Sequence, residues 1–78
     1  MDFKELVTYM VKALVDDPDG VHIHEVEGEK STILELKVTK EDIGKVIGKH
    51  GRIARAIRTI INASATKSGK KVVLEILD

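Results

Sequence analysis

The apolar residues near the N-terminus repeat with the period of an α-helix. They recur at intervals of three and four residues, the spacing of one apolar stripe along a helix: Phe3, Leu6, Val7, Met10, Val11 and Leu14. The pattern predicts a helix from about Phe3 to Val15, with Phe3 in the core and Tyr9 at an edge or interface. Pro18 and Gly20 end it, because the residue before proline disfavours the α region and glycine permits a reversal.

Two segments of alternating apolar and polar residues follow and predict a β-hairpin. In the first, residues 21–27, Val26 falls on the face opposite to the other aliphatic residues, and a bulge near Glu25 would return it to the core side. The second segment, residues 32–38, alternates regularly and points three aliphatic side chains inward: Leu34, Leu36 and Val38. The two strands are expected to pair antiparallel.

The second half of the chain predicts two helices and a strand. Thr39 is placed to cap a helix start, and Asp42 is placed to reach back to it. Gly48 ends this short helix, and residues 52–66 predict the next one. We expect its core face to hold Ile53, Ile57, Ile60 and Ser64, with Ala56, Ile61 and Ala63 beside them. Residues 71–77 predict the last strand.

The resulting order is α-β-β-α-α-β in a single domain over residues 1–78, which is an α+β fold. Because the last strand follows a two-helix crossover, we expect it to run parallel to a strand of the hairpin. The prediction is a three-stranded mixed sheet with three helices on one face. The other face carries apolar candidates for a dimer contact: Ile33, Val73 and Leu77.

Charge is distributed unevenly along the 78 residues, although the formal net charge is zero. Residues 1–42 hold eleven acidic and five basic side chains, a balance of −6. Residues 43–74 hold no acid and eight cations, a balance of +8: Lys45, Lys49, Arg52, Arg55, Arg58, Lys67, Lys70 and Lys71. A fold that gathers the second segment on one side has a positive surface that attracts a polyanion.

Several classes of protein are disfavoured by what the sequence lacks. The chain contains no cysteine, which excludes disulfides and thiolate metal sites and suits a cytoplasmic protein. No apolar run approaches the length of a membrane span, so no membrane association is expected. His22 and His24 share a strand face but have no third ligand, so no metal or other cofactor is expected. Without a nucleophile in a convergent triad, the chain is not expected to be an enzyme.

The segment Gly48-Lys49-His50-Gly51 places two glycines around two basic residues between helical segments. Glycine tolerates positive φ and has no Cβ, so the backbone can turn sharply and a phosphate can come close. The second glycine stands at a helix N-terminus, where N–H groups and the helix dipole attract anions. The loop is therefore a candidate anion site, flanked by Lys49 and Arg52. Considered alone, a G-x-x-G turn is equally consistent with a tight helix-helix connection that binds nothing.

Residues 43–57, IGKVIGKHGRIARAI, resemble the signature of the KH (K-homology) domain. They contain an aliphatic pair, G-x-x-G, and an isoleucine two residues further on. With the order α-β-β-α-α-β, the chain resembles the type II, prokaryotic form. The phrases over residues 39–49 and 54–59 look closer still to the small bacterial KhpA family, and the resemblance covers essentially the whole chain.

The resemblance implies a binder of single-stranded RNA, in which the loop clamps the backbone of about four nucleotides while the bases lie in a narrow groove. Carried over residue by residue, it assigns phosphate contacts to Gly48, Lys49, His50 and Gly51, with Arg52 nearby, and one groove wall to Ile43, Gly44 and Ile47. Charge placement adds Arg55 and Arg58 as candidate RNA contacts, together with the lysines at 67, 70 and 71.

The resemblance also implies partners and a cellular role. KhpA-like proteins pair with themselves, as homodimers, or with the larger KhpB (Jag)-like proteins. They act as RNA chaperones or post-transcriptional regulators on RNAs linked to cell elongation and division. Both aromatic residues lie in the first predicted helix, which argues against the stacking platforms of RRM and OB folds.

Two alternatives from other classes remain open at this stage. A helix-hairpin-helix DNA-binding module also holds phosphates with a glycine loop between two helices, but it lacks a sheet and usually has an apolar residue between the glycines. A protein-interaction domain with a purely structural G-x-x-G turn is the other. A nucleotide-binding P-loop is disfavoured, because the spacing from Gly44 is one residue short and His50 replaces the magnesium-binding hydroxyl.

Overall fold

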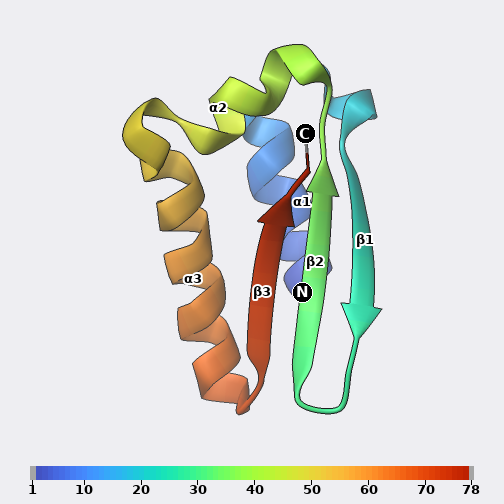
Figure 1. Ribbon diagram of the computed structural model, residues 1–78, viewed down its shortest axis with the longest axis vertical. Coiled ribbons are helices and arrows are strands. Elements are labelled where there is room, and N and C mark those ends of the chain that lie inside the picture. Colours follow the sequence, from blue (N-terminus) through green and yellow to red (C-terminus); the bar gives the residue numbers. More distant parts are fainter. Residues whose placement is uncertain (1, 78) are drawn as a thin grey trace.

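The computed structural model describes residues 2–77, whose helices and strands follow the predicted α-β-β-α-α-β order (Figure 1). The helices are α1 (Phe3–Leu14), α2 (Ile43–Ile47) and α3 (Arg52–Ser68). The strands are β1 (His22–Glu27), β2 (Ser31–Lys37) and β3 (Lys71–Ile76). Short 3₁₀ turns precede β1, α2 and α3, at Pro18–Gly20, Lys40–Asp42 and Lys49–Gly51.

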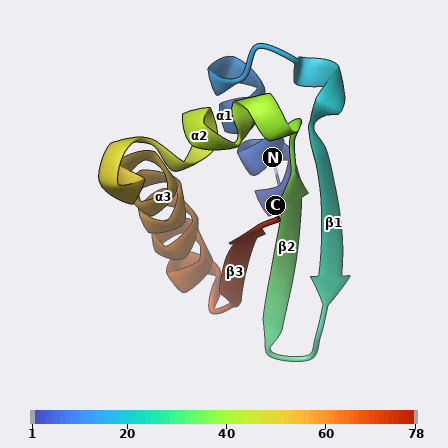
Figure 2. The same ribbon diagram turned by 45° about the horizontal axis from the view of Figure 1, so that its top comes forward.

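The three strands form one sheet in the order β1-β2-β3. β1 pairs with β2 antiparallel and β3 pairs with β2 parallel, which confirms the predicted mixed sheet. All three helices lie on one side of it, with α2 at the end of the helical layer (Figure 2). The chain between α3 and β3 is short, so the end of α3 is tied to the start of an edge strand.

The bulge expected near Glu25 is absent. The pairing of β1 with β2 runs without interruption from His22 opposite Lys37 to Glu27 opposite Thr32. Val26 therefore stays on the open face of the sheet, where it is 44% exposed. An unbroken ladder keeps every backbone pair of the hairpin, and this outweighs the burial of one valine side chain.

The hydrophobic core lies between the helices and one face of the sheet. Its buried members come from every helix, from β2 and β3, and from the residues just before β1 and just after β2: Val7, Val11, Val21, Leu34, Leu36, Val38, Val46, Ile57, Ile61, Ala65, Val72 and Leu74. Phe3 packs against this core, as predicted, while Tyr9 is 70% exposed on the outer side of α1.

The buried face of α3 differs from the predicted one. Ile60 is 46% exposed, and Ala56 and Ala63 are exposed as well. The predicted Ile57 and Ile61 are buried, and the other buried positions are Ala54 and Ala65, so that the four follow helical spacing. The helix is rotated so that two alanines meet the neighbouring elements, because a face of small residues lets a helix approach closely.

The expected cap at Thr39 is also absent, since its side chain makes no hydrogen bond to the backbone of the following turn. Its hydroxyl donates instead to Asp42 Oδ2 at 3.1 Å. Asp42 is 2% exposed, and its carboxylate accepts the backbone N–H groups of Asp16 at 3.3 Å and Asp17 at 3.0 Å. This buried carboxylate therefore ties the start of α2 to the chain that leaves α1.

Candidate nucleic-acid interface

The loop between α2 and α3 adopts a conformation that requires glycine. Gly48 has a φ of 77°, and a Cβ at this position would lie 2.6 Å from Cγ1 of Ile53. Gly51 has a φ of 73°, although a Cβ there would meet nothing within 4 Å. His50 has a φ of 58°, and no other non-glycine among residues 2–77 has a positive φ. The backbone therefore reverses within four residues at a cost in local strain.

Two backbone donors of this loop have no hydrogen-bond partner among residues 2–77. Gly48 N–H donates to Gly44 O at 2.8 Å, and Gly51 N–H donates to Gly48 O at 3.1 Å. Within the described residues, no hydrogen bond uses the N–H groups of Lys49 or His50. Both side chains are exposed. Adjacent N–H groups with cations beside them are suited to an anion such as a phosphate.

The first turn of α3 adds cations to the loop. Arg52 begins the helix and is exposed. Arg55, one turn later, folds back so that its Nη2 donates to His50 O at 2.6 Å and its Nε donates to Gly51 O at 3.5 Å. The structure thus brings five of the predicted site residues together at one corner of the molecule: Gly48, Lys49, His50, Gly51 and Arg52.

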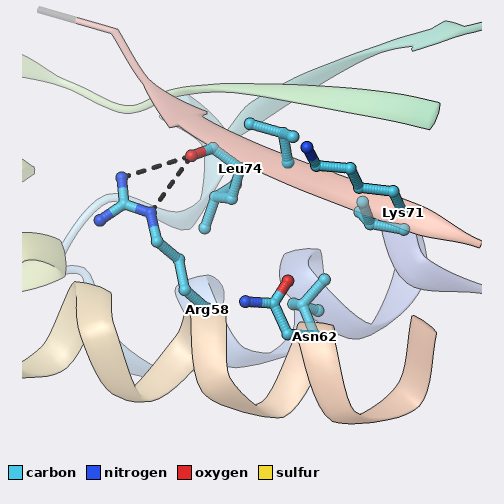
Figure 3. A pocket seen from close by; sticks show the side chains of 7 residues that line it. Arg58, Asn62, Lys71 and Leu74 are labelled. Atoms are coloured by element: carbon cyan, nitrogen blue, oxygen red, sulfur yellow. Dashed lines mark hydrogen bonds between the residues drawn. The ribbon is translucent and has the colours of Figure 1, made fainter. Parts of the chain in front are cut away.

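A cavity of about 200 Å³ lies between α3 and the edge strand β3 (Figure 3). Arg58 enters it from α3 and donates both Nε and Nη2 to Leu74 O, each at 3.3 Å. The remaining lining consists of Ile61, Asn62, Lys71, Val72 and Val73. The groove therefore combines aliphatic walls with the polar edge of a strand and two cationic side chains.

Sequence reasoning singled out Arg58 and Lys71 for their charge but did not anticipate Leu74 or Asn62 as groove residues. Asn62 follows Arg55 and Arg58 at helical spacing, so the sequence could have placed Asn62 on the same face of the helix as these arginines. No signal pointed to the Leu74 carbonyl, because it is the pairing of β3 with β2 that turns this backbone group toward α3.

The residues predicted to form the other wall lie on α2. Ile43 and Ile47 are half-buried and Gly44 is exposed, with open space where a Cβ would stand. Ile43 lines a separate hollow with Lys37, Val38 and Lys40. The structure therefore places Ile43 beside the end of β2 and does not bring it into the cavity that holds Arg58.

Lys45 does not add to a free positive surface. Its Nζ lies 2.5 Å from Asp16 Oδ2 and 3.2 Å from Asp42 Oδ1. Hydrogen bonds to Asp16 and then Asp42 raise the pKa of Lys45. Burial opposes ionisation of Asp42, but hydrogen bonds from Asp17 and Asp16 N–H, with Lys45 and Thr39, outweigh it and lower the pKa of that carboxyl. The charges at this end of the molecule are neutralised internally.

Residues 2–77 contain neither a membrane-spanning helix nor a cluster of metal ligands. None of the helices in this part of the chain combines the length and the apolarity needed to cross a bilayer. No three of its histidine, aspartate or glutamate side chains gather as ligands for a metal ion.

Comparison with known proteins gave a match along nearly the whole chain. The family model described as the KH domain of KhpA and KhpB matches residues 4–76. A protein of Clostridium perfringens named RNA-binding protein KhpA is 64% identical over 74 residues, or 95% of this chain and 99% of that protein. Proteins with the same name from Borreliella burgdorferi (58% identical; 95% of this chain, 90% of that protein) and Aquifex aeolicus (55%; 96% and 95%) are also similar. No solved structure matches the chain.

Proposed function

Since the chain belongs to the KhpA/KhpB family of KH domains, we propose that it is a non-enzymatic, single-stranded RNA-binding protein that grips the RNA backbone with its G-x-x-G loop. The relatives named above carry the name of an RNA-binding protein. The observation that supports this function most directly is local: the N–H groups of Lys49 and His50 have no partner within residues 2–77 and stand beside exposed cations.

In this proposal the loop supplies most of the affinity. Gly48, Lys49, His50 and Gly51 hold consecutive phosphates, and Arg52 adds a charge at the N-terminus of α3. Backbone amides bind phosphates without regard to base identity. The contacts of the Lys49 and Arg52 side chains are ionic, so the logarithm of affinity should fall with the logarithm of salt concentration by about 0.7 for each phosphate that they neutralise on a single strand.

The bases lie beside the loop, against the wall that Ile43, Gly44 and Ile47 form on α2, where Ile43 also lines the hollow at the end of β2. Arg58 and Lys71, in the separate cavity between α3 and β3, and the lysines at 67 and 70 provide polar and ionic contacts to the RNA beyond. Neither aromatic residue lies there, so aliphatic contacts replace stacking. A single copy should therefore bind weakly and with little sequence preference.

Weak binding by one copy favours action in pairs. We propose a homodimer, or a complex with a KhpB (Jag)-like protein, that makes the second RNA contact intramolecular. The open sheet face supports such pairing, because Val26, Ile33 and Val73 lie side by side across the three strands in register. Leu77, just beyond β3, is 38% exposed. We also propose that the protein acts in the cytoplasm as an RNA chaperone or regulator of RNAs linked to cell elongation and division.

A helix-hairpin-helix module for duplex DNA is the weaker candidate. Here the glycine loop connects helices that pack on a three-stranded sheet, whereas a helix-hairpin-helix module has no sheet. Titration of single-stranded RNA and of duplex DNA at one salt concentration separates the two, since the KH proposal requires the RNA to bind more tightly.

The decisive test replaces the exposed side chains between the glycines. In the double variant Lys49→Asp, His50→Asp, a phosphate meets two carboxylates, and we expect single-stranded RNA binding to be lost. Asp tolerates the left-handed conformation at residue 50, so the fold should persist. The matched control Lys12→Asp, His22→Asp changes the same residue types at exposed positions of α1 and β1. Unchanged affinity in a folded loop variant would leave only a structural role for the loop.

A further inference from the structure

We infer that Arg55 is a positioning residue: it does not contact RNA but holds the G-x-x-G loop in the conformation that presents the Lys49 and His50 N–H groups outward. Charge placement alone had made it a candidate RNA contact. The inference rests on the proposed function in one respect, because the held loop is taken to bind phosphates.

The side-chain hydrogen bonds of Arg55 are both made with the loop itself. Nη2 donates to His50 O at 2.6 Å and Nε to Gly51 O at 3.5 Å. These carbonyls belong to consecutive peptide groups, and each peptide group is planar. A guanidinium that contacts both from one side therefore restricts the rotation of the loop about Gly51. The short contact to His50 O is charge-assisted, the stronger class of hydrogen bond.

His50 is the residue whose backbone needs this support. Its φ of 58° is disfavoured for a side chain with a Cβ, so the conformation persists only where the surroundings hold it. The α3 N-terminus offers little else, because Gly51 supplies no capping side chain and the first turn contains no acid. The backbone contributes two hydrogen bonds to this turn, from Gly51 N–H to Gly48 O and from Arg52 N–H to Lys49 O, and the two bonds from Arg55 are its side-chain contacts.

Arg52 provides the internal comparison. It stands one helical turn from Arg55 at the same end of α3 and carries the same charge, yet no hydrogen bond or ion pair within residues 2–77 engages its side chain. Its guanidinium is free to meet a phosphate, whereas that of Arg55 is already committed to two carbonyls. The two arginines therefore have different roles despite their shared charge and exposure.

The first experiment needs no RNA. In Arg55→Met the aliphatic stem remains but the donors are gone, and Arg52→Met is the matched control. We expect the backbone ¹H–¹⁵N heteronuclear NOE of residues 49–51 to fall in Arg55→Met and to stay at the wild-type value in Arg52→Met, with α3 unchanged in both. A loop that is equally rigid in both variants would overturn the inference, whether or not the protein binds RNA.

The second experiment separates positioning from direct contact. Affinity for a fluorescein-labelled single-stranded RNA 12-mer of mixed sequence is measured over a series of KCl concentrations. Arg52→Met should reduce the steepness of the log–log salt dependence by about 0.7, the loss of one phosphate contact. Arg55→Met should lower affinity by about tenfold, as loss of a charge-assisted hydrogen bond implies, while the salt slope stays at the wild-type value.

A salt slope reduced equally in both variants would make Arg55 a phosphate contact and overturn its positioning role. Unchanged affinity in Arg55→Met would overturn it as well. If the wild-type protein does not bind the 12-mer at all, the proposed function fails, and the NOE measurement still decides whether Arg55 holds the loop.

Discussion

The N-termini of α1 and α3 meet the same physical requirement in opposite ways. At α1, Asp2 Oδ1 accepts the Glu5 N–H at 2.7 Å and the Glu5 side chain reaches back to Asp2, a capping box that satisfies the free N–H groups within the chain. At α3, the cap is a glycine, the first turn has no acid, and arginine stands where the dipole favours an anion. One helix start is capped by its own side chains, while the other has no side-chain cap and carries an exposed cation.

The start of α2 shows a third arrangement. Asp42 occupies the place of a capping acid but directs its carboxylate to Asp16, Asp17 and Lys45, which belong to other parts of the fold or to the next turn. The comparison teaches that an acid near a helix start is not sufficient to identify a cap. What the carboxylate contacts decides whether it stabilises one helix or joins two segments.

The largest expected effect concerns the loop that replaces a cap at α3. Gly48→Ala places a Cβ against Ile53 in a backbone of positive φ, so we expect a loss of about 3 kcal/mol in the free energy of unfolding. In Gly51→Ala the positive φ is unfavourable for alanine but the added Cβ meets no neighbour, so the free energy of unfolding should fall by about 1 kcal/mol. Gly44→Ala, in the open on α2, should gain about 0.5 kcal/mol. Urea unfolding measures all three, and equal losses at 48 and 51 would refute the role of Ile53.

The next effect is the pH dependence that Asp42 confers. Its pKa is lower in the folded than in the unfolded chain, so its contribution is present above the ordinary value of 3.8 and is lost as pH falls through the folded pKa. We expect Asp42→Asn to be less stable at neutral pH and to lose less on acidification below pH 3.8 than the wild type does. Unfolding at a series of pH values measures this, with the exposed Asp19→Asn as control. An identical acid response in wild type and Asp42→Asn would contradict it.

The smallest effect is a reciprocal change at the two contrasting helix starts. Asp2→Ala removes the cap of α1 and should cost about 1 kcal/mol without changing RNA affinity. Arg52→Glu supplies the missing acid at α3 and should stabilise the protein by about 0.5 kcal/mol, while RNA affinity falls by about tenfold or more. Melting curves and RNA titrations measure the two quantities on the same samples. If Arg52→Glu destabilises the fold, the start of α3 is not the unfilled anion site described here.

Much of the fold was predictable because its signals are local. The stripe of α1, the alternation of β2 and the turn at Pro18 each depend on neighbouring residues, and the structure confirms them. The buried face of α3 was not predictable in the same way. Ile60 and Ile61 are adjacent, and the helical period accommodates a stripe through either, so only packing against the sheet and α1 selects Ile61.

In the candidate site, too, some features follow from local sequence and others from tertiary packing. The loop of Gly48, His50 and Gly51 was identified from sequence because its backbone conformation depends on residue type at fixed positions. Of the cavity between α3 and β3, only Arg58 and Lys71 were named beforehand, and only for their charge, since its other wall is a strand edge that takes no part in the local pattern. The prediction of a bulge at Glu25 was wrong for a similar reason. It rested on the position of Val26 alone, whereas the register is set by the pairing of all of β1 with β2.

The amino-acid sequence by itself determined the order of the elements, the glycine loop and the separation of charge into an acidic first half and a basic second segment. These follow from helical and strand periods, from the positive φ that glycine permits and from residue counts. The tertiary structure alone decided which cations are available. Folding brings Lys45 to the carboxylate of Asp16, 29 residues away, and Arg58 to the carbonyl of Leu74, 16 residues away. The carboxylate neutralises the charge of Lys45, whereas the neutral carbonyl leaves the charge of Arg58 in place, and no local pattern records either pairing.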